Sequence, residues 1–395
     1  MSIKEIKKGI YWVGAVDWNI RNFHGPSFHT HKGTSYNSYL IMDEKITLVD
    51  IVDNHFSDRL IENIKKIVDP SKIDYVVINH VEPDHSGSFP EIMEYIPNAK
   101  VFCSAKGKDA MMHHYFGEYE YEIVKTGDVI SLGEKSIKFI EAPLLHWPDS
   151  MFSYIEEEKL LLPNDAFGQH IASTKLFDDE HDLPELMAEA KKYYANILMP
   201  MGQNVVRKIK EIMDMGLEID MIAPSHGIIW RTNPEKIVEE YLKWGNFQSE
   251  KKAVIVYETM WNSTEKMAKA LLDGLVSEGV EVKLYKASIS DANDIMTDIL
   301  DASALLIGSS TINNTMIPDM AYVLEELVGL RPKKKVGLAF GSYGWGKGAV
   351  RNIEEKMTKI QVELIREGIE VKYVPTDEDL KMCYDAGVEL GKELV

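Results

Sequence analysis

The first 250 residues alternate short apolar runs with polar connections, at a spacing typical of β-strands. Val, Ile and aromatic residues fill these runs, and Gly, Asp, Asn or Pro separates them. The predicted strands or hairpins are 9–18, 38–51, 74–80, 100–105, 121–143 and 152–165. Apolar residues at helical spacing predict helices at 55–69, 183–198 and 204–216. This half of the chain therefore predicts an α/β sandwich of two sheets with outer helices.

The rest of the chain changes to a regular alternation of strand and helix. The predicted strands are 251–258, 281–287, 304–310, 334–345 and 370–376, and the predicted helices are 264–279, about 291–302, 320–330 and 347–367. Such an alternation is typical of a doubly wound, flavodoxin-like parallel sheet. A polar stretch at 248–252 precedes the first of these strands. We therefore expect two domains, 1–250 and 251–395.

Composition narrows the possible partners and the compartment. The 395 residues carry a net charge of −19, which argues against a general nucleic-acid binder and against binding to an anionic membrane. The two cysteines, Cys103 and Cys383, are too few to hold an iron–sulfur cluster or to form a disulfide scaffold. No stretch is apolar for the length needed to span a bilayer, and the N-terminus has no apolar leader segment. We expect a cytoplasmic protein.

A dense group of possible metal ligands follows the buried strand at 74–79. Such a loop at a rigid strand end can point alternate side chains at a common centre. Three isolated candidates each follow another apolar run in the same half. The ligand candidates are His80, Glu82, Asp84, His85, His146, Asp165 and His226.

Four imidazoles and three carboxylates match the needs of two first-row divalent ions with positions left open for substrate. Two such ions carry +4 and three carboxylates −3, so one bridging hydroxide neutralises the site. One ligand must bridge the ions, and Asp165, alone in its segment, is our choice. The alternative interpretation is that the motif binds no metal. In that case it is a charged loop with a helix cap at Asp84 or Ser86, and His146 or His226, taken alone, is a buried core histidine. Their common setting after strands favours the metal site.

A second candidate site lies at three strand ends of the C-terminal half. Hydroxyl groups and free backbone N–H groups gather where the strand at 251–258 meets the next helix, which suits a phosphate. The alternatives are a simple helix cap by Ser263 or Thr264 and ordinary surface aromatics at Tyr343 and Trp345. The motif G-x-G-x-x-G is absent here, so we do not expect a nicotinamide cofactor. Three loops at the carboxyl ends of the sheet predict FMN. The predicted FMN-binding residues are Thr259, Met260, Trp261, Asn262, Ser263, Thr264, Ser310, Thr311, Ile312, Asn313, Asn314, Ser342, Tyr343, Gly344, Trp345 and Gly346.

The motif H-x-E-x-D-H, followed by His, Asp and His, resembles the metallo-β-lactamase fold. That superfamily usually has His where this chain has Glu82, and a harder oxygen ligand moves the preference from zinc towards iron. With a flavodoxin-like half behind it, the chain resembles the flavodiiron protein family over essentially its whole length. Segments such as LHWPDSMF, APSHGIIWR and GLAFGSYGWG carry the likeness. The resemblance implies a metallo-β-lactamase-like αββα sandwich followed by a flavodoxin-like domain.

The resemblance also assigns ligands and a reaction. It implies one iron held by His80, Glu82 and His146, a second held by Asp84, His85 and His226, and Asp165 between them. In the family, FMN supplies electrons to this non-haem diiron site, which reduces O2 to water, NO to N2O, or both. By the same likeness, His24 and Tyr194 are candidate proton donors just outside the ligand set.

The family resemblance implies partners as well. It predicts a head-to-tail homodimer or a dimer of dimers, in which each FMN faces the partner's irons. The electron donor is then an external rubredoxin, a flavin reductase or a reduced deazaflavin coenzyme. Neither the choice between O2 and NO nor the identity of the donor follows from the ligands.

Two other functions are consistent with parts of the sequence. A metal-dependent hydrolase of the metallo-β-lactamase type predicts zinc and has no use for a flavin. A flavodoxin-like electron carrier with a metal-free scaffold domain predicts gaps in the ligand set, and none is found. Glu82 and the complete ligand set favour a flavodiiron oxidoreductase.

Overall fold

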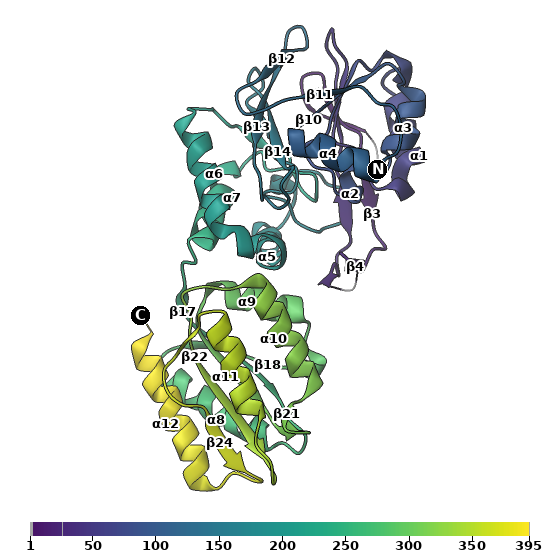
Figure 1. The fold of residues 1–395 in the computed structure, drawn as a ribbon. Helices are drawn as coiled ribbons and strands as arrows, with labels where there is room; N and C mark the ends of the chain where they lie inside the picture. Colours follow the sequence, from purple (N-terminus) through teal and green to yellow (C-terminus); the bar gives the residue numbers. More distant parts are fainter. Residues whose placement is uncertain (1–2, 26, 395) are drawn as a thin grey trace. The chain divides into compact units, whose positions relative to one another are not determined.

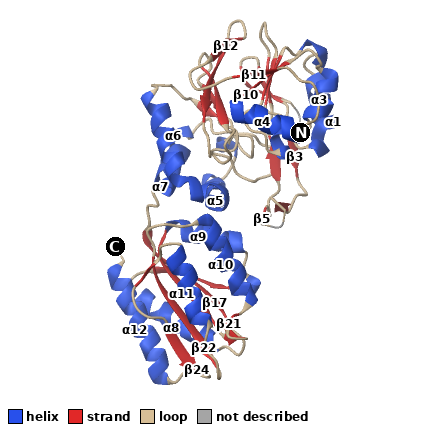
Figure 2. Cartoon of the chain, viewed as in Figure 1, coloured by secondary structure: helices blue, strands red, loops and turns tan. Residues whose placement is uncertain are grey.

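The short apolar runs of the N-terminal half form two β-sheets that enclose one core (Figure 2). The computed structural model describes residues 3–25 and 27–394. The first sheet has the order β1-β2-β7-β8-β9-β10-β11, and the second has the order β12-β13-β14-β15-β16. Trp12 and Val77 of the first sheet are buried in the same apolar cluster as Phe139 and Leu162 of the second. The predicted α/β sandwich is confirmed.

The strands of the first sheet are β1 (Lys4–Lys7), β2 (Ile10–Trp12), β7 (Tyr39–Ile41), β8 (Thr47–Val49), β9 (Tyr75–Val77), β10 (Lys100–Cys103) and β11 (Tyr121–Ile123). Those of the second are β12 (Val129–Ser131), β13 (Ser136–Glu141), β14 (Met151–Ile155), β15 (Leu160–Leu162) and β16 (Met221–Ile222). Two small ribbons pair β3 (Ala15–Asp17) with β6 (Thr34–Tyr36) and β4 (Asn22–Phe23) with β5 (Phe28–His29).

Helices flank both sheets, with α1 and α3 beside one and α6 and α7 beside the other in Figure 1. The longer helices of this half are α1 (Ser57–Lys65), α3 (Phe89–Tyr95), α4 (Ala105–His114), α5 (Leu183–Tyr193), α6 (Gly202–Asp214) and α7 (Pro234–Gly245). The segment predicted as one helix over 183–198 changes form within its length. Its last five residues, Tyr194–Leu198, form a π-helix, η4.

The C-terminal half forms a parallel sheet with helices on its faces. The order β18-β17-β19-β22 continues to β24, so the strand order reverses between β17 and β19. This is the doubly wound, flavodoxin-like arrangement that the sequence predicts. The strands are β17 (Glu250–Glu258), β18 (Glu281–Lys286), β19 (Ala302–Ser309), β22 (Val336–Tyr343), β23 (Glu363–Leu364) and β24 (Ile369–Lys372), with a separate ribbon of β20 (Thr311–Ile312) and β21 (Thr315–Met316). The helices are α8 (Ser263–Ser277), α9 (Ala292–Asp301), α10 (Pro318–Leu330), α11 (Ala349–Lys359) and α12 (Asp377–Glu393).

One helix end and one whole helix in this half differ from the prediction. The predicted helix at 347–367 is wrong at its C-terminal end, because α11 ends at Lys359 and residues 363–364 form β23. Gln361 has a φ of 67°, a left-handed conformation that stops an α-helix. The sequence analysis also missed α12. Its N-terminus carries a recognisable signal, because Thr376 and Asp379 form a reciprocal capping box.

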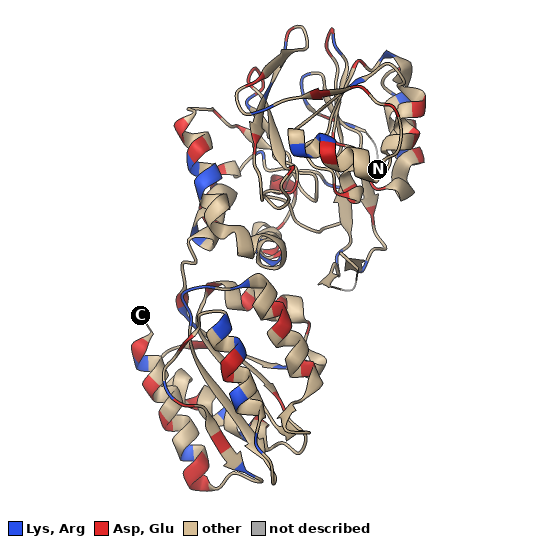
Figure 3. Cartoon of the chain, in the orientation of Figure 1, with Lys and Arg blue, Asp and Glu red and all other residues tan. Residues whose placement is uncertain are grey.

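The chain divides into two units, which we call the first and second units. The first comprises Met1–Tyr193 and Gln203–Leu242, and the second comprises Tyr194–Gly202 and Lys243–Val395. The domain limits 1–250 and 251–395 stay a prediction. Acidic and basic residues both occur on helices of the two units, whereas α9 and α10 carry acidic residues only (Figure 3). Among the described residues, no helix is long and apolar enough to cross a membrane.

Candidate metal centre and flavin pocket

The ligand motif lies where β9 ends and a short helix begins. Asn79 and His80 follow the buried strand, and Glu82 is still extended, with φ −55° and ψ 139°. A proline at the first helical position then starts the one-turn helix α2 (Pro83–Ser86), which carries Asp84 and His85. The change from extended to helical backbone lets neighbouring residues turn towards two different points.

The other three candidate ligands arrive from the second sheet. His146 lies between β13 and β14, Asp165 follows β15, and His226 follows β16. Asn164, just before Asp165, has a φ of 53°, so the chain turns sharply at the strand end. The structure brings all seven predicted ligands together, in two groups.

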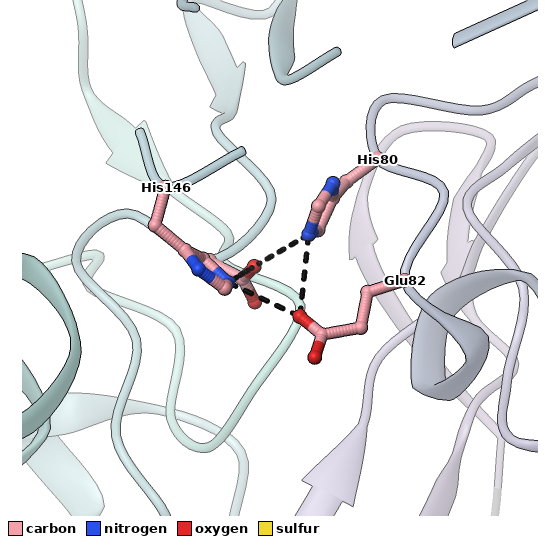
Figure 4. A group of neighbouring side chains, drawn as sticks. His80, Glu82 and His146 are labelled. Atoms are coloured by element: carbon pink, nitrogen blue, oxygen red, sulfur yellow. Dashed lines mark hydrogen bonds and ion pairs between the residues drawn. The ribbon is translucent and has the colours of Figure 1, made fainter. Parts of the chain in front are cut away.

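The first group joins His80, Glu82, His146 and Asp165. Figure 4 shows the first three of these side chains pointing towards one another. Oε2 of Glu82 lies 3.1 Å from Nε2 of His146 and 3.4 Å from Nε2 of His80. Oδ2 of Asp165 lies 3.3 Å from the same nitrogen of His146. All these atoms converge on one small volume, as ligands of a single metal ion do.

The second group joins Asp84, His85 and His226, all buried. Oδ2 of Asp84 lies 3.1 Å from Nε2 of His85 and 3.0 Å from Nε2 of His226. Oδ1 of Asp165 lies 2.8 Å from Nε2 of His85 and 3.5 Å from Nε2 of His226. The two oxygens of Asp165 thus face different groups.

Each group pairs carboxylates with imidazoles so closely that their ionisation is strongly shifted. Burial alone raises the pKa of the Glu82 carboxyl, but His146, His24 and His80 more than reverse this and hold the pKa far below its ordinary value. Burial likewise raises the pKa of Asp165, but His85 and His146 outweigh it and hold that pKa below its ordinary value. Burial lowers the pKa of His85, yet Asp84 and Asp165 raise it to about 9. The site therefore holds carboxylates beside nitrogen donors, ready to exchange protons for metal.

Several buried oxygens in this site make no well-aligned hydrogen bond among the described residues, although imidazole nitrogens lie close to some of them. They are both carboxylate oxygens of Asp84 and Oδ2 of Asp165. Leaving such groups unpaired in the interior is costly. A cation between them satisfies the oxygens, and the mixed set of nitrogen and oxygen donors suits a first-row divalent ion. The residues present therefore fit a pair of metal ions.

Contacts behind the imidazoles escaped the sequence analysis. Nδ1 of His80 lies 2.9 Å from a carboxylate oxygen of Asp149, and Nδ1 of His226 donates to the main-chain oxygen of Ser35 at 2.7 Å. Such contacts orient a metal-binding imidazole. The sequence offered one clue to the Asp149 contact, because Asp149 follows the candidate ligand His146 by only three residues.

Of the two candidate proton donors, His24 lies beside the first group. Its Nε2 is 3.0 Å from Oε1 of Glu82. Tyr194 belongs to the second unit, where its ring packs 5.3 Å from that of Trp244. The preceding residue, Tyr193, was missed, although its ring lies 6.1 Å from that of His226. Its neighbour His170, 4.8 Å from the ring of His226, was missed too.

A pocket of about 410 Å³ opens at the carboxyl ends of β17, β19 and β22, where the strand order reverses. Nine of the predicted FMN-binding residues line it, together with two residues after β24 that were missed, Tyr373 and Val374. The predicted residues in the lining are Met260, Trp261, Ser263, Ser310, Thr311, Ser342, Tyr343, Gly344 and Trp345. Its size and place are typical of a cofactor site in this type of sheet.

The remaining predicted residues surround this pocket without lining it. The Thr264 hydroxyl lies 2.9 Å from that of Ser310 and 3.0 Å from that of Ser342, so three buried hydroxyls meet at its base. The buried hydroxyl of Thr259 has no partner within residues 3–25 and 27–394, as expected where a phosphate binds. The other predicted residues outside the lining are Asn262 at the N-cap of α8, Ile312 in β20, Asn313 and Asn314 before β21, and Gly346 before α11. The hydroxyls and exposed aromatic faces fit an FMN.

Comparisons with known proteins give the same two-part composition. Residues 34–227 match the family described as "ODP family beta lactamase", and residues 255–387 match the flavodoxin family. A protein named nitric oxide reductase from Moorella thermoacetica is 56% identical over 98% of this chain and 98% of its own length.

Solved structures that resemble the whole chain include two at 37% identity. The rubredoxin oxygen:oxidoreductase of the anaerobe Desulfovibrio gigas is 37% identical with a TM-score of 0.97, covering 100% of this chain and 98% of that one. The flavodiiron protein of Giardia intestinalis is also 37% identical, with a TM-score of 0.96, covering 100% of this chain and 97% of that one.

Proposed function

The chain belongs to the flavodiiron protein family, and on this premise we propose that it is an oxidoreductase that reduces NO to N2O, O2 to water, or both. The observation that carries the proposal is the arrangement of seven ligands, five of them buried and two partly buried, in two groups that share Asp165. Nitric oxide is the first substrate to test, since the relative that is 56% identical bears that activity in its name.

Each group would hold one iron. His80, Glu82 and His146 would bind one ion, Asp84, His85 and His226 the other, and Asp165 both. Bound iron and FMN supply two electrons each, the four that convert O2 to two waters without releasing peroxide. The protein keeps the two ligand groups a fixed distance apart, because Asp165 follows a rigid strand and its two oxygens point in different directions.

His24 is our candidate for the proton donor. Its Nε2 contacts Glu82, and its side chain is 31% exposed, so it can exchange protons with solvent while touching the ligand set. We keep Tyr194 as a second candidate on family likeness alone. Because turnover consumes protons, a partly exposed imidazole at the edge of a buried site is well placed to supply them.

Hydrolysis is the weaker alternative. A hydrolase needs no flavin, whereas the second unit has a pocket of cofactor size with three hydroxyls at its base. The relative and the solved oxidoreductase that match the whole chain are named for redox activities.

The two sites lie in different units, so electrons must cross between them. We propose a head-to-tail homodimer, or a dimer of such dimers, in which the flavin pocket of one copy meets the metal centre of the other. Support comes from the rim of the pocket, where four large side chains are more than half exposed. A rim of this kind is typical of a surface that another protein covers. Its residues are Trp261, Trp345, Tyr373 and Val374, exposed by 84%, 95%, 58% and 62%.

An external donor must reduce the flavin. We propose a rubredoxin, because the solved oxidoreductase from Desulfovibrio gigas is named for that partner, with a flavin reductase or a reduced deazaflavin coenzyme as the other donors to test. The two cysteines, Cys103 and Cys383, are both free and buried. That supports our proposal of a reducing, cytoplasmic setting.

Steady-state assays test this function. The full chain, given each donor in turn without oxygen, should consume NO and release one N2O for every two NO. In a separate assay with O2 in place of NO, it should consume O2 without accumulating peroxide. Failure to consume either gas with any donor, in protein that contains iron and FMN, would rule the function out.

A further inference from the structure

Asp149 is a buried carboxylate that reaches back from one ligand loop to another. It lies between β13 and β14, three residues after His146, and is 4% exposed. Its Oδ2 lies 2.9 Å from Nδ1 of His80 and accepts a 2.8 Å hydrogen bond from the backbone N–H of Val81. A single oxygen therefore holds the segment that carries His80 and Glu82 against the loop that carries His146.

The loop of Asp149 is itself anchored. The main-chain oxygen of Asp149 accepts a 2.8 Å hydrogen bond from the hydroxyl of Ser104, which also caps the N-terminus of α4 by accepting from the Gly107 N–H at 2.9 Å. The main chain also links this region to the strand end, because the Met151 N–H donates to the Asn79 oxygen at 2.9 Å. The carboxylate has little freedom to move away from His80.

The second ligand group has no equivalent contact among the described residues. Nδ1 of His226 donates to a neutral main-chain oxygen, that of Ser35, and Nδ1 of His85 has no partner. The two groups differ in this respect although each holds two imidazoles. A negative charge directly behind a ligand imidazole is a property of the first group.

We propose that Asp149 is a positioning residue for the metal position of His80, Glu82 and His146, and that its charge makes this position bind metal more tightly. The inference rests on the proposed function. A carboxylate at Nδ1 keeps the proton on that nitrogen, leaves Nε2 free for the metal, and strengthens the imidazole as a donor. The bond to Val81 fixes the backbone between His80 and Glu82, so the same oxygen orients both side chains.

Asp149→Asn isolates the charge. Both hydrogen bonds end on Oδ2, and the amide oxygen of asparagine can accept both, so this change removes the charge and keeps the shape. Asp149→Leu has a similar shape and removes both bonds. Asp178→Asn is the control for loss of a buried charge outside the two ligand groups, because Asp178 is equally buried and its two oxygens accept hydrogen bonds from residues 231–233.

The test is equilibrium competition between the iron-loaded full chain and a ferrous chelator, without oxygen, with iron and FMN counted at each chelator concentration. In Asp149→Asn, one iron per chain should leave at a chelator concentration about tenfold lower than in wild type, while the other iron and the FMN stay. In Asp149→Leu the shift should be about 100-fold. Asp178→Asn should match wild type.

Three results would overturn the inference. Asp149→Asn holds both irons as tightly as wild type, or it loses both together with FMN, or Asp178→Asn shows the same loss of one iron. A wild-type chain that holds no iron pair refutes the proposed function itself, so the two failures are distinguished by the wild-type sample.

Discussion

Asp165 lies 2.8 Å by its Oδ1 from Nε2 of His85, while its Oδ2 points towards the other ligand group. A carboxylate so placed is the one side chain, among those described, that belongs to both groups of possible metal ligands. Removing it should therefore affect two metal ions at once, whereas removing any other ligand affects one directly.

We predict that Asp165→Ala loses both irons and keeps FMN. The affinity for each metal should fall by at least about 100-fold, because a lost ligand costs more than a lost contact behind a ligand. Metal analysis and flavin absorbance of the purified variant give the answer. Asp220→Ala, on the loop before β16, is the control and should retain both cofactors. A variant that keeps one iron per chain would show that Asp165 serves a single position.

The three hydroxyls at the base of the pocket should contribute to flavin binding. We predict that Thr264→Val weakens FMN binding about tenfold, because the methyl group removes one hydrogen bond from each of Ser310 and Ser342. Fluorescence titration of flavin-free protein measures the change. Ser277→Ala, at the other end of α8, removes a hydroxyl that bonds only the Gly274 oxygen and should leave the affinity unchanged. Equal affinities for Thr264→Val and wild type would place the phosphate elsewhere.

A buried lysine should make the stability of the second unit depend on pH. Burial alone lowers the pKa of the Lys252 ammonium group, but Asp298 and Asp301 reverse this and raise the pKa above its ordinary value. A lysine whose pKa is higher in the folded than in the unfolded protein stabilises the fold. Its contribution to the free energy of unfolding is complete when the pH is below the pKa of the unfolded protein, about 10.4, and is lost as the pH rises through the pKa of the folded protein.

Lys252→Met should therefore lower the free energy of unfolding by about 2 kcal/mol at pH 8, since two carboxylates lose a charged partner. Urea unfolding, monitored through the release of flavin, should show that the difference in unfolding free energy between Lys252→Met and wild type shrinks above about pH 10.5. Lys269→Met removes an exposed pair with Glu265 on α8 and should change little at any pH. A difference that stays constant up to pH 11.5 would contradict the assignment.

A charge in the exposed pocket rim should break the proposed dimer. We expect Trp345→Glu to sediment as a monomer and to lose multi-turnover reduction of NO and O2 even when it is saturated with added FMN, because glutamate is costly to bury in an apolar interface. Val276→Glu places the same charge at the C-terminal end of α8 and should stay dimeric and active. A fully active Trp345→Glu monomer would refute the head-to-tail arrangement.

Much of the molecule follows from local pattern, and the gaps have physical causes. His80, Glu82, Asp84 and His85 are visible because a strand and a helical turn place them within six residues. Every residue has a main-chain oxygen, so a contact such as that of the Ser35 main-chain oxygen with His226 cannot be predicted from residue types. Contacts between distant segments are hidden in the same way.

The ends of helices, like the contacts above, depend in part on packing that the local sequence pattern does not show. The π-helical turn after Tyr193 and the end of α11 at Lys359 depend on packing and on one left-handed residue, Gln361. Helical periodicity continues past both points. The pocket residues Tyr373 and Val374 were missed because β24 lies beside β22, a pairing that only the assembled sheet creates.

The most direct test joins cofactor content to a single turnover. The isolated protein should contain about two irons and one FMN per chain, as the ligand count and the pocket at the carboxyl ends of β17, β19 and β22 predict. When the reduced protein is mixed with NO or O2 in a stopped-flow instrument, flavin absorbance should return in wild type but far more slowly in Asp165→Ala. Native protein that contains zinc in place of iron, and whose reduced flavin reacts with neither gas, would contradict the account.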